Sequence, residues 1–154
     1  MGKTLRFTHI SLNAKDWRKL SEFYTKVFDC RPKPPKRELS GRWLEKATGL
    51  KDAKIEGIHL VLPGHQIFLP TLEIFTYSVM VDSKQKKPNR RGFAHIAFEV
   101  RSVKNTLSLA IKNGGKKLGE IVKKEIKGVG EIEFAYLYDP EDNIVEIQSW
   151  NKVK

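Results

Sequence analysis

The sequence predicts an α+β fold made of two copies of a β-α-β-β-β unit within 154 residues. The pattern Phe-x-His-Ile-x-apolar occurs twice, as FTHISL over residues 7–12 and as FAHIAF over residues 93–98. After each copy comes a segment with helical spacing of apolar residues, and then segments with strand character. Because one helix cannot cover both faces of a sheet, the repeat predicts a cupped mixed sheet with a site on its concave face.

The first module is expected over residues 4–82 and opens with a strand over 4–12. Apolar residues from Trp17 to Phe28 follow helical spacing, which predicts a helix over 16–28 with Asp16 as its N-cap or in its first turn. The prolines after this helix break the pattern, and residues 31–54 are expected to form a long connection. Within that connection, residues 41–53 fit a short helix or an irregular strand. Two further strands are expected, over residues 55–64 and from residue 71 to about 81.

Residues 83–91 are the expected linker, and the second module is expected over residues 92–150. Its elements follow the same order. They are a strand over 92–100, a helix over 102–113 capped by Ser102 and stopped by Gly114-Gly115, strands near 117–125 and 131–138, a turn over 139–143 and a last strand over 143–150.

The formal net charge of +11 suggests attraction of an anionic partner. The basic residues fall mainly in connecting segments, and no zinc-finger, recognition-helix or RNP pattern accompanies them. We therefore expect no nucleic-acid partner, although steep salt dependence of binding would reveal one. No apolar run is long enough to span a membrane, and the N-terminus lacks signal-peptide and myristoylation patterns. A cytoplasmic protein without a membrane partner is expected.

The repeated histidines are the main functional signal. Side chains alternate along a strand, so His9 shares a face with Phe7 and Ser11, and His95 shares a face with Phe93 and Ala97. A single strand histidine is usually structural. Two histidines in equivalent strands favour a metal site instead.

Each module also carries one glutamate between aliphatic residues of its last strand, Glu73 and Glu146. A carboxylate in such a strand needs a partner, which can be water, a lysine or a metal ion. Two histidines and two glutamates would form a ligand set for one divalent metal ion, with Zn, Ni, Co, Mn and Fe all compatible.

The chain resembles the vicinal oxygen chelate superfamily, which includes glyoxalase I, methylmalonyl-CoA epimerase, extradiol dioxygenases and bleomycin-resistance proteins. The resemblance covers about residues 4–150 and rests on FTHISL, EFYTKVF, TLEIF, GFAHIAFEV and DPEDNIVEIQSW. It implies paired βαβββ modules, often in a homodimer, with ligands in the first and fourth strands of each module. Those positions hold His9, Glu73, His95 and Glu146, a set similar to that of bacterial glyoxalase I. The four ligands could come from one subunit or from two.

The resemblance implies a glyoxalase-like lyase or isomerase, in which a metal ion stabilises an enolate or enediolate and a carboxylate moves a proton. Glu146 is the expected base, with Glu73 as its counterpart. An epimerase like methylmalonyl-CoA epimerase is an alternative, but Ile55 stands where that family has a glutamate, and Glu56 is one residue away. A non-catalytic binding or resistance protein of the same fold is the other alternative.

Three more residues are candidates for the pocket that receives a small, anionic substrate. His59 has no partner in the repeat and is expected to be structural or to contact the substrate. Tyr77 shares strand parity with Glu73, and its alternative is core packing. Glu133 could take part in proton transfer, although a solvent-facing position is the simpler expectation.

Overall fold

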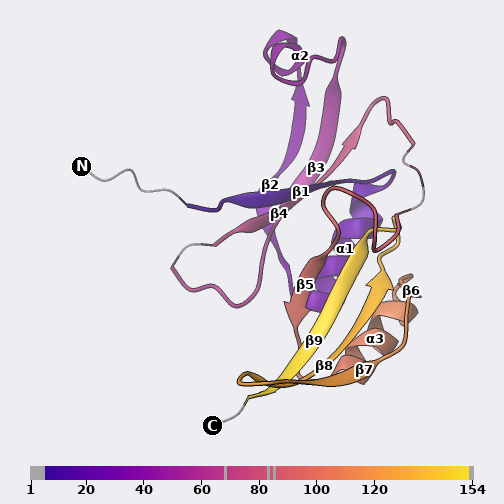
Figure 1. The fold of residues 1–154 in the computed structure, drawn as a ribbon. Coiled ribbons are helices and arrows are strands. Elements are labelled where there is room, and N and C mark those ends of the chain that lie inside the picture. Colours follow the sequence, from indigo (N-terminus) through magenta and orange to yellow (C-terminus); the bar gives the residue numbers. More distant parts are fainter. Residues whose placement is uncertain (1–5, 68, 83, 85, 153–154) are drawn as a thin grey trace. The chain divides into compact units, whose positions relative to one another are not determined.

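A computed structural model describes residues 6–67, 69–82, 84 and 86–152, and Figure 1 shows its course. The chain divides between Val81 and Asp82 into two compact units, which correspond to the two repeats and are described separately below. Each unit holds a mixed sheet and few helices, so the fold class is α+β, as the repeat predicts. Residues 4 and 5 of the predicted first strand, and residues 83 and 85 of the predicted linker, lie outside the described residues.

The described residues of the first unit form four strands and two helices. In chain order they are β1 (His9–Asn13), α1 (Trp17–Phe28), β2 (Arg31–Ser40), α2 (Arg42–Thr48), β3 (Lys54–Val61) and β4 (Thr71–Tyr77). The strands lie in the order β1-β4-β3-β2. Only β1 and β4 pair in parallel, while β4 with β3 and β3 with β2 are antiparallel.

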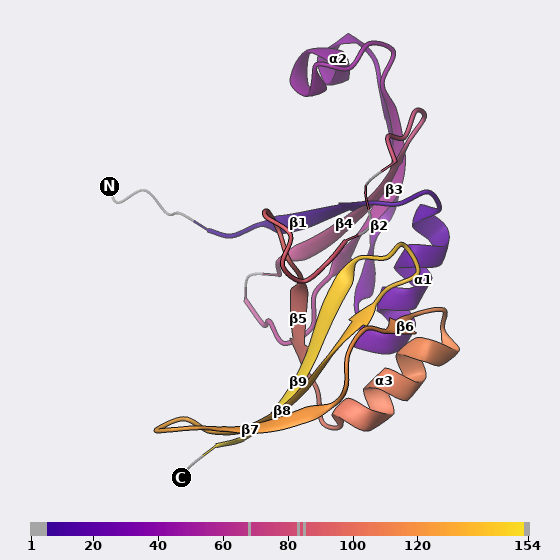
Figure 2. The same cartoon turned by 45° about the vertical axis from the view of Figure 1, so that its right-hand side comes forward.

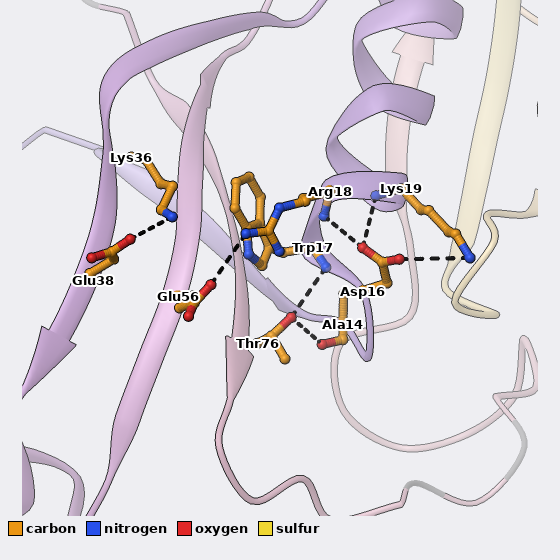
Figure 3. A network of polar contacts seen from close by, with 9 residues as sticks. All are labelled: Ala14, Asp16, Trp17, Arg18, Lys19, Lys36, Glu38, Glu56 and Thr76. Atoms are coloured by element: carbon orange, nitrogen blue, oxygen red, sulfur yellow. Dashed lines mark hydrogen bonds and ion pairs between the residues drawn. The ribbon is translucent and has the colours of Figure 1, made fainter.

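Helix α1 covers one face of this sheet. Its apolar stripe packs toward strand residues that alternate along β3 and β4, and Leu60, Leu72 and Ile74 are completely buried. Asp16 is the N-cap, the first of its two expected positions, because its Oδ1 accepts hydrogen bonds from the backbone N–H groups of Arg18 and Lys19. The backbone N–H of Trp17 donates to Oγ1 of Thr76 at 3.1 Å and so ties the start of the helix to β4 (Figure 3).

The expectation that residues 31–54 form a long connection misses a strand at the start of this segment. The proline-rich stretch forms β2, which is an edge strand, and its pairing with β3 shifts register between Lys33 and Arg37. An edge strand bonds to a neighbour on one side only, so it tolerates prolines that a central strand would not. The ambiguous segment that follows resolves into helix α2.

The second unit has the same arrangement of strands, except that two short strands form the edge of its sheet. Its elements are β5 (Ile96–Glu99), α3 (Val103–Lys112), β6 (Lys116–Lys117), β7 (Val122–Ile126), β8 (Gly130–Tyr138) and β9 (Ile144–Lys152). The order is β5-β9-β8-β6, with β7 also paired to β8, and β5 and β9 are parallel. Helix α3 packs on β8 and β9, as Figure 2 shows, and Ser102 caps it as predicted.

In both units the first strand begins later than predicted. Strand β1 begins at His9, which pairs with Thr71, the first residue of β4. Strand β5 begins at Ile96, which pairs with Val145 next to the start of β9. The backbone carbonyl of Thr8 still accepts a hydrogen bond from the Thr71 N–H at 3.0 Å, one residue before β1 begins. His95 lies one residue before the start of β5.

Candidate functional site

Three polar side chains meet on the face of the first sheet that is opposite to α1. Strand pairing places Ser11 of β1 beside Glu73 of β4, and His9 is two residues before Ser11 on the same face. On the other side of β4, His59 of β3 pairs directly with Glu73. The carboxylate of Glu73 therefore lies between two histidines from neighbouring strands.

The distances show that both histidines contact this carboxylate. Nε2 of His59 lies 3.2 Å from Oε1 of Glu73, and Nε2 of His9 lies 3.6 Å from Oε2. Nδ1 of His59 is 3.4 Å from Oγ1 of the buried Thr71. The Glu73 side chain is only 14% exposed, so its carboxylate is surrounded by these imidazoles more than by water.

Burial lowers the pKa of His59, and the nearby positive charges of Arg37 and Lys33 act in the same direction, while the negative charge of Glu73 opposes them. The net direction is downward, so burial outweighs the ion pair and His59 favours the neutral form. A neutral imidazole has one donor and one acceptor nitrogen, which suits its contacts with a carboxylate and a hydroxyl.

An apolar cluster borders this polar group on the same sheet face. The ring of Phe75 meets the ring of His59 edge-on, with centroids 5.8 Å apart. Phe75 in turn belongs to a buried cluster with Leu44 of α2, and Tyr77 packs against that cluster. The cluster consists of Leu44, Ala53, Ile55 and Phe75, with Leu39 and Tyr77 at its margin. Tyr77 lies on the same sheet face as Glu73, and there it packs against the apolar cluster. This contact fits the core-packing alternative for Tyr77.

The second unit holds an equivalent pair. Ala97 of β5 pairs with Glu146 of β9, and His95 precedes Ala97 by two residues, as His9 precedes Ser11. Nε2 of His95 lies 2.9 Å from Oε2 of Glu146, whose side chain is 13% exposed. Glu73 and Glu146 could have faced water or paired with lysines. In the structure each of them contacts an imidazole instead.

Tyr136 is a site residue that sequence reasoning missed. It lies in β8 directly opposite Glu146, and its ring is 5.3 Å from that of His95. Burial raises the pKa of Tyr136, and so do the charge of Glu146 and its side-chain hydrogen bond with that carboxylate. The signal was present in the sequence, since a hairpin closed by the turn at 139–143 places residue 136 beside residue 146.

Two glutamates lie away from these groups. Glu133 has the opposite strand parity to Tyr136 and lies 3.8 Å from Nζ of Lys123, so the structure does not bring it to His95 and Glu146. Glu56 lies on the α1 face of β3, where its Oε2 is 3.5 Å from Nη2 of Arg18 (Figure 3). The pairing of β3 with β4 is continuous, so no bulge turns Glu56 toward Glu73.

Cys30 is buried, and burial together with the charge of Asp29 raises its pKa to about 12. A thiol with such a pKa stays protonated near neutral pH, whereas a nucleophile must be a thiolate. Cys30 therefore packs as a small apolar side chain.

The donor chemistry of both pairs fits a divalent metal ion. Imidazole nitrogen and carboxylate oxygen are ligands for Zn, Ni, Co, Mn and Fe, and each unit supplies one of each on one sheet face. Within the part of the chain that the structure describes, no group of three or more His, Cys, Asp or Glu side chains is arranged to hold a metal ion. The set of four ligands therefore stays a prediction, and it requires both units.

Comparison with known proteins identifies the family. The model of the Glyoxalase/Bleomycin resistance protein/Dioxygenase superfamily matches residues 6–147, and the chain belongs to this superfamily. No curated protein matches.

Solved structures show the same fold. A glyoxalase family protein from Bacillus cereus is 19% identical, with a TM-score of 0.81 over 97% of this chain and 96% of that one. The genomically encoded fosfomycin resistance protein FosX from Listeria monocytogenes is 22% identical, with a TM-score of 0.58 over 98% and 96%. A mutant of FosX was crystallised with Mn(II) and 1S,2S-dihydroxypropylphosphonic acid, and it is 17% identical with a TM-score of 0.57 over 96% and 94%.

Among the described residues, no helix combines the length and apolar character needed to cross a membrane.

Proposed function

We propose that the protein is a divalent-metal-dependent lyase or isomerase of the glyoxalase type, acting in the cytoplasm on a small, anionic, oxygenated substrate. One observation carries the proposal. In both modules the same strand positions hold a histidine and a glutamate, with a nitrogen-to-oxygen distance of 3.6 Å in the first and 2.9 Å in the second. We propose that His9, Glu73, His95 and Glu146 together bind one metal ion.

A bound divalent ion would polarise a substrate oxygen and stabilise the enolate or enediolate form of the substrate. Residues of the chain would transfer the proton and hold the base in position. The carboxylate of Glu146 is the proposed base, which takes a proton from the carbon adjacent to the substrate's carbonyl or thioester group and returns it. The hydroxyl of Tyr136 would donate a hydrogen bond to the same carboxylate and so hold it in place. Glu73 is the proposed counterpart of Glu146 on the other side.

The epimerase alternative has weaker support. That reaction in the related family needs a further glutamate on the third strand, where this chain has Ile55 in an apolar cluster. The nearest carboxylate, Glu56, lies on the opposite sheet face and pairs with Arg18. A non-catalytic binding protein of the same fold would need neither metal nor base, and the experiment below tests for it.

Small phosphonates form a second class of candidate substrates. FosX has the same fold, and its mutant was crystallised with a phosphonic acid and Mn(II). The net charge of +11 favours anions of this kind. A substrate screen should therefore include fosfomycin besides thiol adducts of 2-oxoaldehydes and acyl-CoA thioesters.

The decisive experiment measures metal content by elemental mass spectrometry on protein purified without chelator or an affinity-tag metal. We expect about one divalent metal ion per chain in the wild type, by analogy with single-ion sites built from four ligands. The variant His9→Ala/His95→Ala should lose it. The exposed His65, which lies in the segment between β3 and β4, provides the matched control, and His65→Ala should retain the metal.

No metal in the wild type after incubation with Ni, Co, Zn or Mn would contradict the proposal. Binding of small molecules by such a metal-free protein would then support the non-catalytic alternative.

A further inference from the structure

The two glutamates share an arrangement that extends beyond the His–Glu pairs. Glu73 has His9 on its parallel side and His59 directly opposite on its antiparallel side. Glu146 has His95 on its parallel side and Tyr136 directly opposite on its antiparallel side. His59 and Tyr136 thus occupy the same position of the repeat, and each contacts its glutamate. His59 does have a counterpart in the second module, contrary to the sequence analysis, but it is not a histidine.

The contacts of His59 constrain the carboxylate of Glu73. Its Nε2 lies 3.2 Å from Oε1, while Oε2 is the oxygen that lies toward His9. The ring itself is held at two other points, because Thr71 contacts Nδ1 and Phe75 packs against the ring edge. A carboxylate with one oxygen held this way has lost most of its rotation about the last side-chain bond.

We infer that His59 is a positioning residue, which holds Oε1 of Glu73 and thereby presents Oε2 to the metal ion. The inference rests on the proposed function for the identity of the bound group. The inference requires that Thr71 donates its hydroxyl proton to Nδ1, so that the hydrogen of the neutral ring is on Nε2 and is donated to Glu73. Partners of this kind orient metal-binding side chains, and their loss typically reduces metal affinity by about 10–100-fold.

The test compares three variants with the wild type in Mn(II) titrations, with free Mn(II) measured by electron paramagnetic resonance. His59→Phe keeps a ring against Phe75 but removes the hydrogen bond, and we expect about 10–100-fold weaker binding. His59→Gln keeps an N–H donor and should restore most of the affinity. His65→Phe is the matched control, since it changes an exposed histidine to the same residue, and it should bind as the wild type does.

Two results of the titration would overturn the inference. Unchanged affinity in His59→Phe would mean that the ring only packs. Complete loss of binding in both His59→Phe and His59→Gln, as expected for His9→Ala/His95→Ala, would mean that His59 is itself a ligand. Melting temperatures of all variants show whether each is folded under the conditions of the titration.

A second measurement on metal-free protein separates this inference from the proposed function. Long-range proton–nitrogen spectra of the histidine rings, recorded where the rings are neutral, report which nitrogen carries the hydrogen. A predominant Nε2–H form of His59 supports the inference even if the wild type binds no metal, which would contradict the proposed function alone. A predominant Nδ1–H form overturns it, because no proton would then remain for donation to Glu73.

Discussion

At the scale of single residues, the candidate site depends on mostly buried carboxylates that contact imidazoles. Glu73 and Glu146 are mostly buried, and each has a histidine at the same repeat position. Charges in such surroundings are sensitive to the protonation of their neighbours. For His59 the direction of the pKa shift is clear, because burial lowers its pKa despite the adjacent carboxylate of Glu73.

The lowered pKa of His59 has a consequence for the stability of the metal-free protein. The unfolded chain, with an ordinary histidine pKa of about 6.5, binds a proton at a higher pH than the folded chain does. The contribution of His59 is therefore fully present above about pH 6.5 and is lost as the pH falls through its folded-state pKa. We expect His59→Gln to lose less stability than the wild type between pH 7.5 and pH 5.5 in urea unfolding.

The variant His65→Gln is the control, because it removes an exposed histidine and should follow the wild type over the same pH range. Parallel losses in wild type and His59→Gln would contradict the prediction.

At the scale of secondary-structure elements, the site face of the first sheet depends on close contact between β3 and β4. Gly57 pairs with Phe75, and a Cβ atom at Gly57 would come within 2.0 Å of the Ile74 carbonyl oxygen and 2.4 Å of Cδ1 of Phe75. The absence of a side chain at this position lets the Phe75 ring lie over β3 and reach the edge of His59.

Gly57→Ala should therefore destabilise the protein by about 1–3 kcal/mol or more, as expected when an atom is forced into a packed region. The free energy of unfolding in urea measures the effect. Gly119→Ala is the matched control, since no atom lies within 4 Å of the Cβ position there. Equal stability of the two variants would show that the strands separate at little cost.

The sequence predicts the elements that have strong local signals. Both long helices and their caps were correctly predicted, because apolar spacing and capping residues are properties of the local chain. Strand β2 was missed, since its prolines are tolerated only through its position at the sheet edge, which depends on the whole sheet. The register that places His59 opposite Glu73 is similarly a property of the paired strands, whereas Tyr136 could have been found from the hairpin.

At the scale of the whole molecule, large apolar side chains remain exposed in both repeats. Phe7 and Phe93 occupy equivalent positions, two residues before His9 and His95, and they are 64% and 108% exposed. Single exposed apolar residues are common, but a pair of aromatic residues at repeated positions next to the candidate site favours contact with another surface. This agrees with the homodimer that the sequence predicts.

We expect a dimer of twice the 17.7 kDa chain mass in light scattering over several protein concentrations. Phe93→Ser should weaken self-association, because it removes an exposed aromatic ring without emptying a core position. The control Val129→Ser changes another exposed apolar residue, outside the repeated motif, and should remain dimeric. A monomer at every concentration would reject the dimer.

The pairing of first and last strands also bears on how such a chain can be rearranged. Because β1 lies beside β4 and β5 lies beside β9, each sheet is completed by one uninterrupted stretch of chain. New chain ends placed between Val81 and Asp82, with the original ends joined, would interrupt no strand pair of either sheet. The strand pairing within the two sheets therefore imposes no particular sequential order on the two halves.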